Sequence, residues 1–207
     1  NMISGNKAKS FLEGGVDYVT ETNMNIQEKL WKDYDLESQI FLRKTDDRRA
    51  EPRKDVRMKQ FNAKISNARD LYEFGDFYAD FSAFTLSSSL EGLHVETTPA
   101  DLYTIKMVAA RSAAPDGPQG TFQRNVVGAQ TNWDLFRGSD LFSAFRIGVQ
   151  AVTNQDDSST ITASTTTKDL RNTVVGIDGD ISFARHFSLN YEIARSAHVE
   201  DDDLNTT

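Results

Sequence analysis

Apolar and polar residues alternate along two long stretches of the chain, residues 29–43 and 187–195. In the first stretch, the even positions are mostly apolar: Leu30, Lys32, Tyr34, Leu36, Ser38, Ile40 and Leu42. The odd positions include three carboxylates in a row: Trp31, Asp33, Asp35, Glu37, Gln39, Phe41 and Arg43. Because successive strand side chains point to opposite faces, the pattern predicts a long strand with one apolar and one charged face. Both stretches exceed the usual strand length of about five or six residues, which is a first indication of a membrane protein.

The same alternation recurs along the chain and predicts an all-β fold, an antiparallel up-and-down meander of about ten long strands. We expect these strands near residues 10–21, 29–43, 56–67, 76–81, 90–97, 103–109, 121–135, 145–151, 175–183 and 187–195. In the fourth, Phe77, Ala79 and Phe81 are assigned to the apolar face and Asp76 and Asp80 to the polar face. Residues 22–28 are expected to be a short polar connection.

The predicted connections differ in length at the two ends of the sheet. Long or Ser/Pro-rich segments follow the even-numbered strands, such as 44–55, 84–89, 113–120 and 153–171, whereas short ones follow the odd-numbered strands. In a meander, all even connections lie at one end. Short turns at one end and long loops at the other are typical of outer-membrane barrels. The pattern therefore favours a transmembrane β-barrel.

Composition is compatible with such a barrel. Hydrophobic residues make up 38% of the chain, and the mean hydropathy is -0.52. The sequence has no run of roughly 20 apolar residues, as a membrane helix requires, but barrel strands face lipid only at every second position. The net charge of -8 argues against nucleic-acid binding, and the absence of cysteine excludes a disulfide framework.

Two segments, residues 13–18 (EGGVDY) and 120–128 (GTFQRNVVG), look like strands of large bacterial barrels. With them, the chain resembles the large, porin-like outer-membrane β-barrels of Gram-negative bacteria, over nearly its whole length and without a motif that names a subfamily. The resemblance implies a place in the bacterial outer membrane as a pore, conduit or scaffold. Its partners would be lipid, lipopolysaccharide, and a plug or another envelope protein.

Complete barrels of this kind keep both termini in the periplasm. Here the first predicted strand starts, and the last one ends, at the long-loop end. We therefore expect residues 1–207 to be a single segment, an incomplete portion of a larger barrel.

This orientation assigns three sets of candidate residues. Charged side chains on the polar face are expected to line the lumen: Asp33, Asp35, Glu37, Asp76, Asp80, Lys106, Arg124, Arg146, Asp178, Asp180 and Glu192. Aromatic side chains near the short-turn end are expected to form a membrane girdle: Tyr18, Tyr103, Trp133, Phe183 and Phe187. Basic side chains near the long-loop end are expected to face lipopolysaccharide phosphates: Lys44, Arg57, Lys59, Arg111 and Arg195.

Two alternatives remain open from the sequence. The lumen charges either bias the passage of solutes or merely balance one another. The chain as a whole is either a barrel segment or a soluble antiparallel β-sandwich that acts as an extracellular binding module, in which the apolar face would be a core.

No enzymatic, cofactor or metal site is predicted. The pairs Asp33/Asp35 and Asp178/Asp180 supply too few oxygens for calcium, and the three histidines have no metal-ligand spacing. No nucleophile motif surrounds the serines, and no phosphate-binding loop is present.

Overall fold

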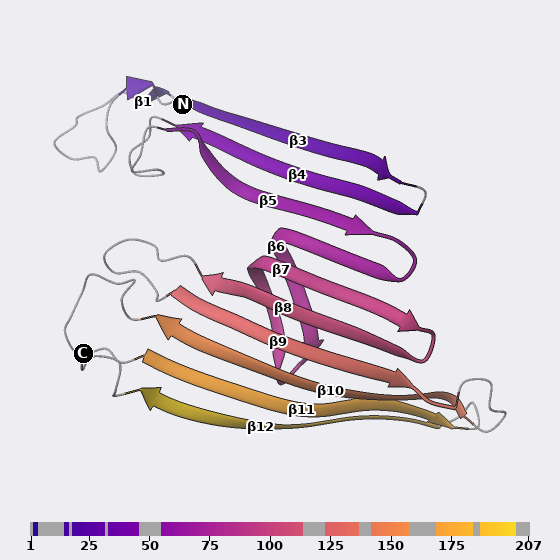
Figure 1. Ribbon diagram of the computed structural model, residues 1–207. Helices are drawn as coiled ribbons and strands as arrows, with labels where there is room; N and C mark the ends of the chain where they lie inside the picture. The colour runs from indigo at the N-terminus through magenta and orange to yellow at the C-terminus, as the bar shows by residue number, and fades with distance from the viewer. Residues whose placement is uncertain are drawn as a thin grey trace.

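The computed structural model describes residues 2–3, 15–16, 18–31, 33–45, 55–113, 123–136, 142–157, 169–183 and 187–201. Ten antiparallel strands form one sheet in the order β12-β11-β10-β9-β8-β7-β6-β5-β4-β3 (Figure 1). Their bounds are β3 Val19–Leu30, β4 Tyr34–Thr45, β5 Arg57–Ser66, β6 Asp70–Ser82, β7 Leu86–Ala100, β8 Tyr103–Ala113, β9 Gln123–Asp134, β10 Phe142–Asp157, β11 Asp169–Phe183 and β12 Phe187–Asp201. Two short strands, β1 (Met2–Ile3) and β2 (Gly15–Val16), pair only with each other. The up-and-down meander is thus confirmed, in a sheet that is open, with β3 and β12 as its edges.

The strand register sorts side chains onto two faces, which we call the polar face and the apolar face. Glu37 pairs with Lys64, which pairs with Glu73, and this row defines the polar face. Val149 pairs with Ile177, which pairs with Ile193, and this row lies on the apolar face. The alternation that predicted the strands therefore continues from strand to strand, since paired residues share a face.

The first predicted strand is wrong in its bounds. The strand runs over Val19–Leu30 (β3) and includes the residues expected to be a connection. The reversal lies instead at residues 31–33, where Trp31 has a φ of 56°. Of the predicted stretch 10–21, residues 10–14 and 17 lie outside the described residues.

The difference between the two ends of the sheet largely persists. One end carries the connections 31–33, 67–69, 101–102, 135–141 and 184–186, and we call it the short-turn end. At the opposite end, which we call the long-loop end, neighbouring strands are separated by longer stretches of sequence, 46–56, 114–122 and 158–168, most of which lie outside the described residues. The connection between β6 and β7 departs from this rule, because it spans only residues 83–85.

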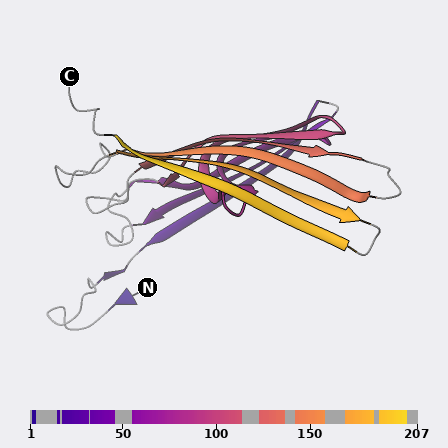
Figure 2. The same ribbon diagram turned by 90° about the horizontal axis from the view of Figure 1, so that it is seen from below.

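That departure has a structural reason. The outer part of the β6–β7 hairpin leaves the sheet and runs across β8, β9 and β10 (Figure 1). Figure 2 shows the ten strands as one twisted layer, with the end of the hairpin on one side of it. The hairpin is therefore a partial second layer.

Candidate functional site

The hairpin bends at a pair of glycines. Gly75 of β6 and Gly92 of β7 are register partners, and Gly75 has a φ of 90°, a conformation that residues with a side chain rarely adopt. A Cβ on Gly75 would lie against the carbonyl oxygen of Phe61. Beyond this point β6 pairs only with β7, since the ladder between β5 and β6 ends at Asn62 and Gly75.

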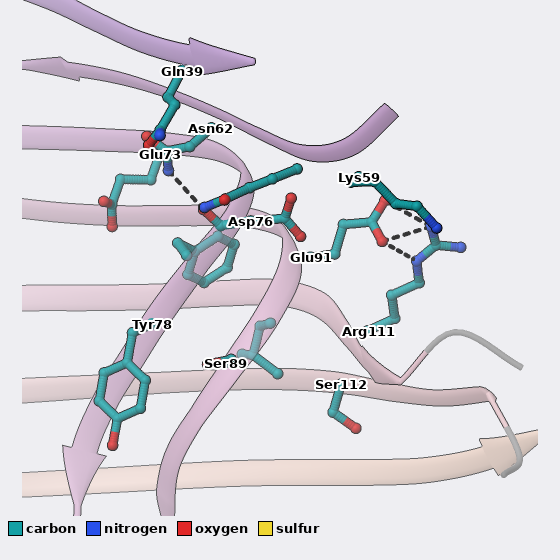
Figure 3. Close-up of a pocket in the computed structure, with 13 residues that line it drawn as sticks. Gln39, Lys59, Asn62, Glu73, Asp76, Tyr78, Ser89, Glu91, Arg111 and Ser112 are labelled. Atoms are coloured by element: carbon teal, nitrogen blue, oxygen red, sulfur yellow. Dashed lines mark hydrogen bonds and ion pairs between the residues drawn. The ribbon is translucent and has the colours of Figure 1, made fainter. Parts of the chain in front are cut away.

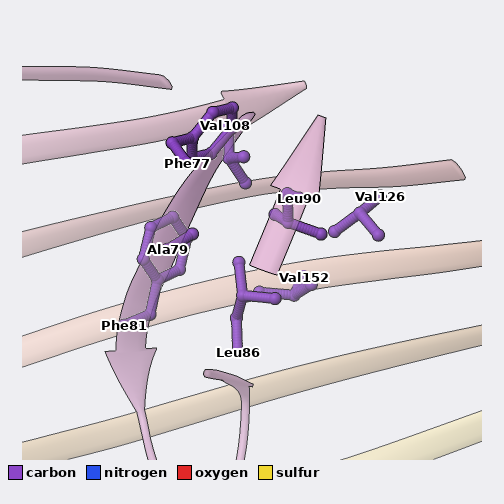
Figure 4. Packing of buried hydrophobic residues seen from close by; sticks show 8 residues of the cluster. All are labelled: Phe77, Ala79, Phe81, Leu86, Leu90, Val108, Val126 and Val152. Atoms are coloured by element: carbon purple, nitrogen blue, oxygen red, sulfur yellow. The ribbon is translucent and has the colours of Figure 1, made fainter. Parts of the chain in front are cut away.

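Apolar side chains hold the folded hairpin against the polar face. Phe77, Ala79, Phe81, Leu86 and Leu90 of the hairpin form one buried cluster with Val108, Val126 and Val152 of β8, β9 and β10 (Figure 4). Burial of two phenylalanines and two leucines contributes at most about 6–12 kcal/mol, at about 1.5–3 kcal/mol each. The hairpin is thus docked by its own hydrophobic core.

A glycine on the sheet makes room for the docked hairpin. A Cβ on Gly128 would lie 3.0 Å from Phe81 Cε2 and 3.0 Å from Val152 Cγ2. A larger residue there would push the Phe81 ring outward.

Hydrogen bonds to the hairpin backbone complete the docking. Lys106 Nζ donates to the Asp80 carbonyl at 3.4 Å, and buried Gln130 Nε2 donates to the Phe81 carbonyl at 2.9 Å. The Phe84 amide donates to Glu192 Oε1 on β12 at 3.0 Å. The hairpin therefore reaches from β8 to the edge strand of the sheet, with its backbone groups satisfied by side chains of the polar face.

A charged cluster lies beside the tip of the hairpin. Arg146 Nη2 is 2.8 Å from Asp180 Oδ2 and 3.8 Å from Asp178 Oδ2, and a cavity of about 310 Å³ is lined by these residues together with Phe81, Tyr191 and others. Asn132 Oδ1 and Asp178 Oδ1 converge above Gly148, and neither has a hydrogen-bond partner among the described residues. Both oxygens are buried, so they are unsatisfied acceptors beneath the cluster and lie out of reach of solvent.

Other charges of the polar face pair across neighbouring strands. Arg124 contacts Asp156 at 2.5 and 2.9 Å, Lys106 lies 3.7 Å from Glu96, and Lys64 lies 3.6 Å from Glu37. Within the described residues, much of the charge is therefore locally compensated, as the balancing alternative from the sequence expects.

The register places most predicted lumen residues on one face. Asp35, Glu37, Lys106, Arg124, Arg146, Asp178, Asp180 and Glu192 lie on the polar face, and Asp33 lies in the turn before β4. Asp76 and Asp80 instead have the parity of Phe74, on the opposite side of β6. The apolar-face assignment of Phe77, Ala79 and Phe81 is wrong, because these residues are buried against the polar face.

Four of the five predicted girdle residues lie at the short-turn end. Tyr103 pairs with Trp133, and Phe183 pairs with Phe187. Tyr18 lies at the opposite end, immediately before the start of β3, because the predicted first strand had its reversal in the wrong place. The sequence interpretation missed Phe136, Phe142 and Phe145, whose rings pack together with centroids 5.3–5.6 Å apart near the same short turns.

The predicted basic set divides in the structure. Lys44, Arg111 and Arg195 lie on the apolar face. Arg57 pairs with Arg43 on the polar face. A β-bulge between the pairs Phe41–Gln60 and Leu42–Met58 adds one residue to β5, so the residues of β5 before the bulge change faces. Lys59 lies in that bulge.

Sequence reasoning also missed a buried histidine at the base of the hairpin. His94 Nδ1 is 2.8 Å from Glu73 Oε2, and its ring stacks on Phe77 with centroids 5.5 Å apart. Its position opposite Glu73 depends on the register, which no local pattern reveals.

No group of three or more His, Cys, Asp or Glu side chains suited to a metal ion occurs among the described residues. In the same part of the chain, no helix is both long and apolar enough to cross a membrane. Comparisons with family models, with curated proteins and with solved structures give no match to this chain.

Proposed function

We propose that this chain forms part of the wall of a porin-like bacterial outer-membrane β-barrel, whose charged interior passes polar solutes past the folded hairpin. The observation that carries the proposal is the position of the second layer. The hairpin covers the polar face, whereas Val149, Ile177 and Ile193 on the apolar face are 44%, 48% and 73% exposed.

A soluble sandwich would have the opposite arrangement. Its second layer would cover the apolar face, because burying apolar surface is what stabilises a sandwich. An apolar face that extends over β7 to β12 and stays uncovered is what a lipid-facing wall requires.

The hairpin gives the proposal a mechanism of selection. A hairpin folded onto the polar face narrows the interior of a barrel, and the Arg146–Asp180 cluster lies beside its tip. Solutes would then pass a constriction lined by charged side chains, and this selects by size and polarity.

A pair of lysine substitutions tests the membrane orientation. Ile177→Lys places a charge on the apolar face, and Asn190→Lys places the same charge on the polar face opposite Asp180. In the complete barrel reconstituted in lipid vesicles, Ile177→Lys is expected to lower the free energy of unfolding by about 2–4 kcal/mol, and Asn190→Lys is expected to lower it by much less. The measurement is a urea titration in which the folded fraction is read from heat-modifiable migration on a gel. The proposal would be refuted if the two substitutions lowered the free energy of unfolding equally. It would also be refuted if the wild-type protein were monodisperse without detergent.

Conductance in planar bilayers, recorded with the complete barrel of which this chain would form part, tests transport separately. An open conduit gives discrete ion-conducting steps, and a plugged scaffold gives none. The basic residues Lys44, Arg111 and Arg195 belong to the same proposal as lipopolysaccharide contacts. Unchanged lipopolysaccharide binding after their joint substitution by glutamine would exclude that role.

A further inference from the structure

A second, larger cavity lies where the hairpin has left the sheet. It has a volume of about 770 Å³ and is lined by side chains of β4, β5, β6, β7 and β8 (Figure 3). Beyond Gly75, β5 no longer has β6 as a neighbour, and β8 no longer pairs with β7 beyond the Glu91–Arg111 pair. The cavity therefore occupies the part of the sheet from which two strands have turned away.

The register shows that residues of both faces line this cavity. Gln39 and Asn62 pair on the polar face, whereas Glu91 and Arg111 pair on the apolar face, and all four line the cavity. A solute bound there has access to groups from both sides of the wall.

The ionic groups around the cavity are already engaged. Arg111 forms a bidentate pair with Glu91 at 2.6–3.0 Å, and Asp76 Oδ2 accepts the Phe61 amide at 2.8 Å. Glu73 pairs with His94 at 2.8 Å, and Lys59 also has an interaction partner. A charged ligand would have to compete with these pairs, which disfavours ions as ligands.

The side chains left for a ligand are uncharged. Gln39, Gln60, Ser89 and Ser112 line the cavity, and none of these side chains has a hydrogen bond among the described residues. Together they offer two amides and two hydroxyls, each both a donor and an acceptor. Tyr78, which is 60% exposed, also lines the cavity, and the electron-rich face of its ring suits the C–H groups of a sugar ring.

We propose that this cavity binds an uncharged polyhydroxylated solute of oligosaccharide size. Such a solute is favoured by the array of side chains that both donate and accept hydrogen bonds, and by the aromatic ring. The volume of the cavity also lies within the range of about 300–1,000 Å³ that is typical of ligand sites. The inference deepens the proposed function, because it names the solute that the barrel would take. Binding is nevertheless measurable without a bilayer, so its failure is distinguishable from a failure of membrane insertion or conductance.

The test is calorimetric titration of the detergent-folded protein with maltotriose, compared with gluconate and glucosamine as charged probes. Maltotriose is expected to bind more tightly than either. Gln39→Leu and Gln60→Leu are each expected to weaken binding by about fivefold, the loss of one neutral hydrogen bond. The matched control is Gln27→Leu on β3, an exposed glutamine outside the cavity, which is expected to bind as the wild type does.

Three results would overturn the proposal: tighter binding of a charged probe, no binding of maltotriose by folded protein, or equal effects of the Gln39 and Gln27 substitutions. Heat-modifiable migration of each variant shows that it is folded. Binding of maltotriose without conductance would support the site while counting against transport.

Discussion

Replacing Phe81 with alanine tests whether the hairpin is held against the sheet by the apolar cluster. The Phe81 ring is 7% exposed and lies above Gly128, and its carbonyl accepts the Gln130 hydrogen bond. The substitution removes the ring and leaves that backbone hydrogen bond available. It therefore isolates the apolar part of the docking energy.

The magnitude follows from the burial of the ring. A buried phenylalanine replaced by alanine costs about 3–5 kcal/mol, which is a large share of the roughly 6–12 kcal/mol assigned above to the whole cluster. Because each 1.4 kcal/mol is about a factor of ten in an equilibrium constant, the undocked fraction is expected to rise by at least about 100-fold. The pairing between the other strands of the sheet is not touched by the substitution, so the sheet should keep its structure.

The absence of native cysteine provides a clean assay. Ala79 is fully buried beneath the hairpin, at 0% exposure, so a cysteine in Ala79→Cys reacts with a maleimide only when the hairpin opens. The labelling rate is expected to rise at least about 100-fold in the Phe81→Ala background, and to be unchanged by Leu189→Ala on the apolar face. Rapid labelling before any further substitution, or equal rates with and without Phe81, would refute the docked hairpin.

Three further substitutions probe the bend and the seat of the hairpin. Gly75→Ala brings a Cβ against the Phe61 carbonyl at a positive φ, and is expected to destabilise the bend by more than about 1 kcal/mol and to speed the maleimide labelling. Asp76→Ala removes the acceptor of the Phe61 amide and should lower the free energy of unfolding in urea by about 1–3 kcal/mol. Asp76→Asn keeps an acceptor oxygen and should lower this free energy much less. Gly128→Val fills the space beneath Phe81 and should raise the labelling rate, whereas an unchanged rate would show that the ring does not rest there.

The ten-strand meander was predictable because most strands alternate strictly and have turn residues between them. The first reversal was not, because its turn at residues 31–33 starts at Trp31, a bulky residue that rarely adopts the left-handed conformation found there. The face on which Arg57 lies was also predicted wrongly. A bulge changes the parity of β5, and no residue in that segment signals it.

The folded hairpin did leave a trace in the sequence. In β6, Tyr72 and Phe74 occupy even positions, whereas Phe77, Ala79 and Phe81 occupy odd ones. In β7, the apolar side chains change from even to odd positions between Leu90 and Leu93. Both changes fall at the paired glycines Gly75 and Gly92. When apolar side chains change between even and odd positions at paired residues of two neighbouring strands, the apolar side chains beyond that point lie on the other face of the sheet. The larger cavity follows from this bend, but its lining depends on long-range register and cannot be predicted from the local pattern.

The hydrogen bond from Phe84 to Glu192 has a consequence for the order of assembly. It joins residues 108 positions apart in the chain, so the hairpin cannot reach its final contact until β12 has been added to the sheet. Contacts of such separation form slowly, because the intervening chain must be ordered first. The apolar cluster on β8, β9 and β10 can form before that strand is added. The contact between Phe84 and Glu192 is therefore expected to be the last step in docking the hairpin.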